Sequence, residues 1–182
     1  LSSMGIEWDG EVMRGGELRQ PSSTLDCKNS GTALRFLIGQ AATCEFKIVL
    51  DGDSSLRARS SLLLPKSLGV QVTTKNDDCE YPMEITGPFN LESVEIDVSK
   101  TSQFHSSILL MTPRTDGFAI TTKGDAVSRN HSELTWDLCK RTGAEIPGKP
   151  WIVTCPDVII PPDASMMAFA KLANLGIENA PD

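Results

Sequence analysis

The stretch TLDCKNSGTALRFLIGQAATCEFKIVL, residues 24–50, predicts a strand, a polar turn, a helix and a second strand in that order. Between residues 30 and 43 apolar side chains recur every three or four positions, the spacing of one helical face, and residues 46–50 resemble a short buried strand. Two strands joined through a helix are typical of parallel strands in one sheet. This segment therefore favours an α/β fold.

The same pattern continues and then repeats. A helix over 56–68, ended by Gly69, and strands over 70–74 and 82–86 complete a β-α-β-α-β-β unit. Pro65 lies inside this helix and indicates a kink or a shorter helix as the alternative. The second copy has strands at 93–98 and 118–122, helices at 102–111 and 129–142, and a strand pair at 144–146 and 151–154. The triplets DGD (51–53) and KGD (123–125) lie 72 residues apart. We therefore predict a duplicated supersecondary unit rather than a short solenoid repeat.

Four regions follow from this pattern. Residues 1–20 are expected to be the tail of an earlier unit, 21–90 a second unit and 91–156 a third. Residues 157–182 are expected to hold a crossover strand over 158–160 and a helix over 163–175. The chain begins with Leu, in what is expected to be the end of a helix, and shows no signal peptide. We expect a piece of a longer polypeptide.

Length and composition narrow the classes of function. With 182 residues, 40% of them hydrophobic, the chain is long enough to bury one globular core. A net charge of −7 without a Lys/Arg cluster argues against nucleic-acid binding, although a locally basic pocket can still hold an anion. No apolar run approaches the roughly 18 residues of a membrane span. The five cysteines include no CxxC pair, so we expect reduced thiols, no metal and a cytoplasmic protein.

Polar residues gather where predicted strands end and helices begin. These segments are NSGT (29–32), RAR (57–59), SKTSQ (99–103) and SRNH (128–131). Each has a structural alternative, either a helix cap or a solvated helix start, and His105 and His131 are more often structural than catalytic. We nevertheless expect the four segments to lie close together, because the strand ends and helix starts of parallel units lie on one rim of the sheet. That rim would hold an anion or a polyol, and no acid–base pair is evident.

Five segments in the same order resemble the family of 5-enolpyruvylshikimate-3-phosphate (EPSP) synthases. They are LDCKNSGTALR (25–35), DGDSSLRAR (51–59), SKTSQF (99–104), KGDAVSR (123–129) and PDAS (162–165). Ser60, Thr101, His131 and Pro162 depart from the family pattern, which has proline, serine, often tyrosine and glycine there. The resemblance implies one globular half of a two-domain enolpyruvyl transferase, an inside-out α/β barrel built from such units. The resemblance also implies a partner for this half, namely the other half of the same polypeptide.

The resemblance also implies a reaction and its residues. The family transfers the carboxyvinyl group of phosphoenolpyruvate to the 5-hydroxyl of shikimate 3-phosphate, releases phosphate and needs no cofactor or metal. It implies that Thr101, Ser102, Gln103 and Ser128 bind shikimate 3-phosphate, and that Asn29, Gly31, Arg59 and Gln103 bind phosphoenolpyruvate. The catalytic acid and base are expected in the other half. This chain alone would then be inactive, and the complete protein a monomer in the cytoplasm.

Two other functions remain open. A transferase acting on UDP-N-acetylglucosamine shares the fold but uses a cysteine on a mobile loop, and none of the five cysteines lies in a matching segment. The second is a non-catalytic half that holds shikimate 3-phosphate without chemistry. Of the two nearby arginines, only Arg59 is expected to face the ligand, because Arg57 would point away on the same helix and be exposed or paired with an acidic residue.

Overall fold

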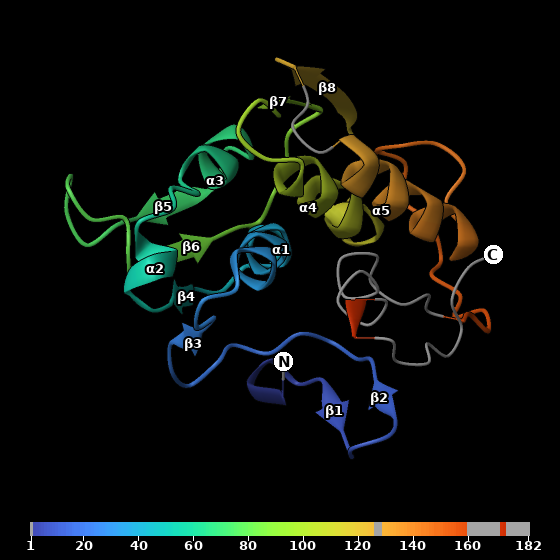
Figure 1. The fold of residues 1–182 in the computed structure, drawn as a ribbon, viewed down its shortest axis with the longest axis horizontal. Helices are drawn as coiled ribbons and strands as arrows, with labels where there is room; N and C mark the ends of the chain where they lie inside the picture. The colour runs from blue at the N-terminus through green and yellow to red at the C-terminus, as the bar shows by residue number, and fades with distance from the viewer. Residues whose placement is uncertain (1, 126–128, 160–171, 174–182) are drawn as a thin grey trace.

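A computed structural model of the chain describes residues 2–125, 129–159 and 172–173. Within them the strand–helix–strand passage occurs twice, as the sequence predicts (Figure 1). The first passage is β3 (Leu25–Asp26), α1 (Gly31–Ala42) and β4 (Ile48–Asp51), and the second is β7 (Ser93–Asp97), α4 (Gln103–Met111) and β8 (Ala119–Lys123). In both, the two strands pair in parallel. The α/β class is confirmed.

The larger sheet has the strand order β3-β4-β6-β5. Strands β5 (Gln71–Thr73) and β6 (Met83–Thr86) pair antiparallel, and β6 also pairs antiparallel with β4. A short antiparallel pair, β1 (Glu7–Trp8) and β2 (Met13–Arg14), precedes this sheet. Two 3-10 turns, Ser2–Met4 and Thr112–Arg114, complete the described elements. No helix in these ranges is long and apolar enough to cross a membrane.

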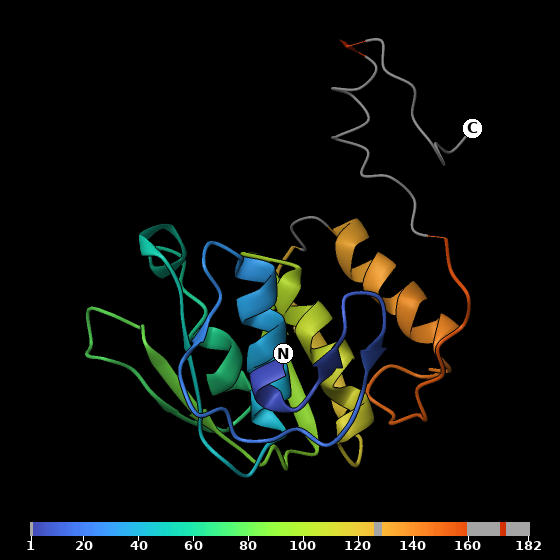
Figure 2. The same cartoon turned by 90° about the horizontal axis from the view of Figure 1, so that it is seen from below.

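Helices α1 and α4 lie side by side in both views (Figures 1 and 2). Their contacts run in parallel register: Thr32 meets Gln103, Arg35 meets Ser107, and Gln40 meets Leu110. The helices are in close contact at Gly39, where an added Cβ would lie 2.5 Å from Ser107 Oγ and 2.9 Å from Ser107 O. Both helices therefore begin at the same end of the molecule.

One hydrophobic core joins the two repeated passages. Leu34 and Ile38 of α1 pack with Leu50 of β4, Ile96 of β7 and Ile108 of α4, all fully buried. Helix α1 contacts the sheet at β4 and β6 on one side and α4 on the other. Helix α4 in turn contacts α5 (Arg129–Arg141). The two copies thus fold as one packed body.

The single helix predicted over 56–68 is wrong. The structure has two short helices there, α2 (Ser54–Arg57) and α3 (Leu63–Ser67). Between them, the N–H groups of Ser61 and Leu62 donate to the carboxylate of Glu80, a residue outside this segment. Backbone donors engaged in this way are not available for a continuous helical ladder.

The strand pair predicted over 144–146 and 151–154 is also wrong. These residues form no ladder; Thr154 N instead donates to Thr142 O, and Gly148 O accepts from Phe118 N. Pro147 and Pro150 remove two backbone donors from this stretch, which weakens strand pairing. Of the strand predicted at 158–160, residues 158 and 159 are not in a strand. Residue 160 and most of the helix predicted at 163–175 lie outside the described residues, so that helix stays a prediction.

Replacing Gly39 with alanine is expected to destabilise the protein. The new Cβ would push against the backbone oxygen of Ser107, and overpacking of this kind costs about 1–3 kcal/mol. The middle of that range, about 2 kcal/mol, exceeds the gain of about 1 kcal/mol that alanine normally brings to a helix. Urea unfolding measures the difference. Gly15→Ala is the matched control, because nothing lies within 4 Å of its added Cβ. Equal stability of the two variants would contradict the close helix packing.

Candidate functional site

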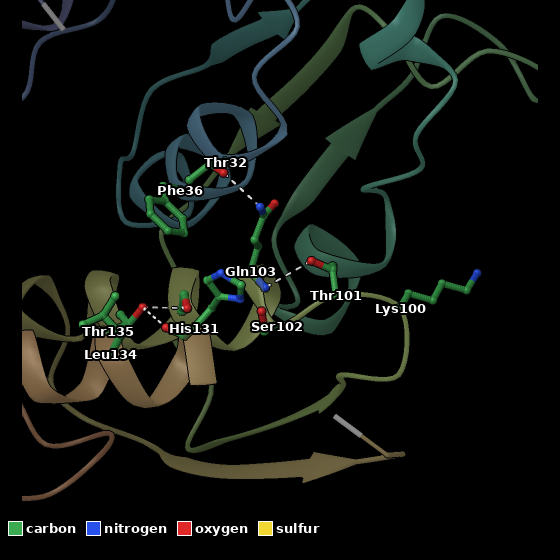
Figure 3. Close-up of a pocket in the computed structure, with 10 residues that line it drawn as sticks. Thr32, Phe36, Lys100, Thr101, Ser102, Gln103, His131, Leu134 and Thr135 are labelled. Carbon is green, nitrogen blue, oxygen red and sulfur yellow. Dashed lines mark hydrogen bonds between the residues drawn. The ribbon is translucent and has the colours of Figure 1, made fainter. Parts of the chain in front are cut away.

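A pocket of about 310 Å³ lies where α1, α4 and α5 begin (Figure 3). Its lining comes from all three helices and from the loop before α4: Thr32, Phe36, Lys100, Thr101, Ser102, Gln103, Ser106, His131, Leu134 and Thr135. Of the residues expected to bind shikimate 3-phosphate, Thr101, Ser102 and Gln103 are here. Ser128 lies outside the described residues. The hydroxyls of Thr101 and Ser102 and the amide of Gln103 are hydrogen-bond donors for an anionic ligand, whereas the side chain of Lys100 points away from them (Figure 3).

The first turn of α4 presents its polar side chains to this pocket. Ser102 is only 4% exposed, and its hydroxyl makes no capping bond to the helix it precedes. Thr101 Oγ1 accepts from the backbone N–H of Gln103 at 3.2 Å. A helix start with free N–H groups carries a partial positive charge, so this turn suits a phosphate or a carboxylate.

Gln103 is fixed at both ends of its amide. Its Nε2 donates to Thr32 Oγ1 at 2.9 Å, and its Oε1 accepts from Arg35 Nη1 at 2.6 Å (Figure 3 shows the first bond). Arg35 also donates through Nε to Ser61 Oγ at 3.3 Å and lies 5.6 Å from the centre of the Phe104 ring. Partial burial lowers the pKa of the Arg35 guanidinium, and the charge of Arg59 adds to this effect. The guanidinium remains a cation.

The residues expected to hold phosphoenolpyruvate also come together. Arg59 Nη2 donates to the backbone oxygen of Asn29 at 2.7 Å and to the Asn29 side-chain oxygen, and Nε donates to Ser55 O at 3.2 Å. A Cβ on Gly31 would lie 3.2 Å from Arg59 Nη1 and 3.3 Å from Arg35 Nη1. The absence of a side chain at Gly31 therefore lets two guanidiniums approach the first turn of α1.

Neither of these two cations is neutralised nearby. Arg59 and Arg35 form no ion pair with any acidic group in the described ranges, and their partners there are neutral oxygens. Two adjacent unpaired guanidiniums beside helix N-termini favour an anion with planar oxygens. The described part of the chain contains no cluster of side chains fit for a metal ion.

Arg57 points elsewhere, as predicted. Its Nε and Nη2 donate to the two carboxylate oxygens of Asp51 at 2.9 and 2.6 Å, and this pair raises the pKa of Arg57. The predicted reason is wrong, however. The two arginines do not diverge on one helix, because α2 ends at Arg57 and Arg59 lies beyond the cap residue Ala58.

Several lining residues escaped the sequence reasoning. Phe36, Ser106 and Thr135 line the pocket and Arg35 bonds to its Gln103, but none of the four was among the expected site residues. Arg35 lies four residues after Gly31 and thus one turn along the same helical face, which was a usable signal. Ser106 and Thr135 share a hydrogen bond of 2.8 Å that joins α4 to α5, a contact no sequence pattern indicates.

Known proteins resemble both the sequence and the fold. The family model of EPSP synthase (3-phosphoshikimate 1-carboxyvinyltransferase) matches residues 2–174. A 3-phosphoshikimate 1-carboxyvinyltransferase of Methanococcoides burtonii is 37% identical over 78% of this chain and 35% of its own length. One from a Bradyrhizobium species is 33% identical over 91% of this chain and 40% of its own. EPSP synthase from Acinetobacter baumannii has a TM-score of 0.65 at 26% identity, covering 79% of this chain and 34% of that one.

Repeated β-α-β passages with their helix starts at one pocket are part of the enolpyruvyl transferase fold, a class with two domains. The chain belongs to the EPSP synthase family. It spans little more than a third of the length of the relatives it matches.

Replacing Arg35 with methionine is expected to lower the free energy of unfolding by about 1–2 kcal/mol. The change leaves Gln103 Oε1 and Ser61 Oγ without their charged donor, and the partial exposure of Arg35 reduces the cost. Lys47→Met is the matched control, because Lys47 forms only an exposed pair with Glu84 at 3.4 Å. Denaturant unfolding of both variants checks this, and a control loss as large as that of Arg35→Met would count against the network.

Proposed function

We propose that this chain supplies one half of the active site of an EPSP synthase. The complete enzyme would transfer the carboxyvinyl group of phosphoenolpyruvate to the 5-hydroxyl of shikimate 3-phosphate through a tetrahedral ketal and release phosphate. The observation that carries this proposal is the pair of unpaired guanidiniums, Arg35 and Arg59, that flank Gly31 beside the oriented amide of Gln103. The product would serve the synthesis of chorismate and aromatic amino acids in the cytoplasm.

The site residues that the structure describes have roles that their surroundings support. Thr101, Ser102 and Ser128 would bind the phosphate of shikimate 3-phosphate, with Ser102 preplaced in a nearly buried position. Arg59 and the Gly31 N–H would hold phosphoenolpyruvate, and Asn29 would fix the guanidinium that meets it. Hydrogen bonds between a guanidinium and an anionic oxygen are charge-assisted and therefore stronger than bonds between neutral groups.

Gln103 would connect the two substrates. Its amide is already oriented by Thr32 and Arg35, so little side-chain entropy would be lost when a ligand binds. The chain spans little more than a third of its relatives, and the general acid and base would come from the remainder of the complete polypeptide. Two substrates held in one geometry would then react as a preassembled pair.

Ser102→Ala in the complete polypeptide is expected to weaken binding of shikimate 3-phosphate about tenfold or more. The variant loses one hydrogen bond to a charged group, worth about 1.5–3 kcal/mol. Titration calorimetry with shikimate 3-phosphate measures the change, and Ser93→Ala on the exposed edge of β7 is the control. Less than a twofold change in affinity would refute the assigned role of Ser102.

Arg59→Lys is expected to raise the KM for phosphoenolpyruvate or lower kcat strongly, because an ammonium cannot replace a bidentate guanidinium. Arg57→Lys, the matched control, should cost about tenfold or less, since Arg57 is bonded to Asp51 and not to the pocket. Steady-state kinetics of the complete polypeptide compare the two. The reverse ranking would remove Arg59 from the site.

A further inference from the structure

The five residues between α2 and α3, 58–62, carry Arg59 and have little regular structure of their own. Arg59 N donates to Leu56 O at 2.9 Å, which closes the end of α2. Beyond that point the N–H groups of Ser61 and Leu62 and the backbone oxygen of Arg59 bond to residues 80 and 81, which precede β6. The backbone oxygens of Ser61 and Leu62 accept from Leu64 N and Lys66 N of α3. The guanidinium of Arg59 donates to Asn29 and Ser55, whereas the backbone that carries it is held by side chains about twenty residues away.

Glu80 is the main external contact. Its carboxylate accepts from Ser60 Oγ at 2.5 Å, from Ser61 N at 2.9 Å and from Leu62 N at 3.3 Å. Ser61 is fully buried, so its backbone donor needs this acceptor. A single carboxylate thus holds three consecutive residues directly after Arg59.

Tyr81 adds a fourth bond to the same segment. Its hydroxyl donates to the backbone oxygen of Arg59 at 3.1 Å, and its ring is fully buried. Burial also raises the pKa of the Tyr81 phenol, so the hydroxyl keeps the proton it donates. The backbone is consequently fixed at the carbonyl of Arg59 by Tyr81 and at the residues that follow it by Glu80.

The contacts of Glu80 also extend, through Ser61, to the guanidinium of Arg35. Ser61 donates its N–H to Glu80 and accepts, through Oγ, a bond from Arg35 Nε at 3.3 Å. Among the described residues Glu80 accepts from neutral donors and forms no ion pair with Arg35 or Arg59. Glu80 can therefore hold the segment without neutralising the charges that would bind an anion.

We propose that Glu80 is a positioning residue for phosphoenolpyruvate, acting through the backbone of residues 60–62 on Arg59. This inference rests on the proposed function and assigns no contact between Glu80 and either substrate. Loss of the carboxylate releases the 58–62 segment, and the guanidinium leaves its place beside Gly31. The affinity for phosphoenolpyruvate falls, whereas the hydroxyls of Thr101 and Ser102 that would hold the phosphate of shikimate 3-phosphate have no bond to this segment and keep their places.

Steady-state kinetics of the complete polypeptide test this inference. Glu80→Ala is expected to raise the KM for phosphoenolpyruvate about tenfold, and Ser60→Ala, which removes one exposed hydroxyl, about threefold. The KM for shikimate 3-phosphate should stay within twofold in both. Glu84→Ala is the matched control, because Glu84 is an acidic residue of β6 whose carboxylate accepts from Lys47 at the surface. If Glu80→Ala does not fold, Ser60→Ala and Tyr81→Phe decide the same question.

A double-mutant cycle separates positioning from general destabilisation. In an Arg59→Lys background, Glu80→Ala should add less than twofold to the KM for phosphoenolpyruvate, because its effect acts through the missing guanidinium. Fully additive effects, or an equal rise in both KM values, would overturn the inference while the proposed function stands. If the complete polypeptide makes no product, or Arg59→Lys leaves the kinetics unchanged, the proposed function itself fails and this inference with it.

Discussion

The close contact between α1 and α4 at Gly39 determines how the starts of these two helices lie relative to each other at the site. Because no side chain separates the helices there, Ser107 Oγ reaches the backbone oxygen of Arg35 at 2.6 Å and the two helices run in parallel register. Parallel helices begin at the same end, so their free N–H groups and partial positive charges add at one place. A longer side chain at position 39 would separate the helix starts as well as their middles.

This local charge explains how an acidic chain can hold an anion. The net charge is −7, but the acidic groups nearest the site are engaged in other contacts. Asp51 binds Arg57 in a bidentate pair, and Glu80 accepts only from neutral donors. Arg35 and Arg59 are left as cations at the start of α1, next to the hydroxyl-rich start of α4. Short-range placement of charge, rather than the overall balance, decides what this surface can bind.

Local patterns in the sequence were enough to predict some elements and not others. Helix α1 and strand β4 follow from apolar spacing and a capping serine, since Ser30 Oγ does accept from Ala33 N. The break after α2 does not, because it depends on Glu80, which is distant in the sequence. The departure from the family pattern at Ser60 was visible, but its bond to Glu80 was not. The same holds for Arg35, whose importance arises from a partner on another helix.

Duplication gives the site its two unlike halves. Helix α1 begins at Gly31 and helix α4 begins at Gln103. The same position of the two copies therefore has no side chain in one and a long amide side chain in the other. The glycine provides space into which two guanidiniums fit, and the glutamine provides a long amide that crosses from α4 to Thr32 on α1. A single unit would offer one helix start and one of these features. The parallel packing of two diverged copies is what places a cation pair and an oriented amide within reach of the same small, highly charged ligands.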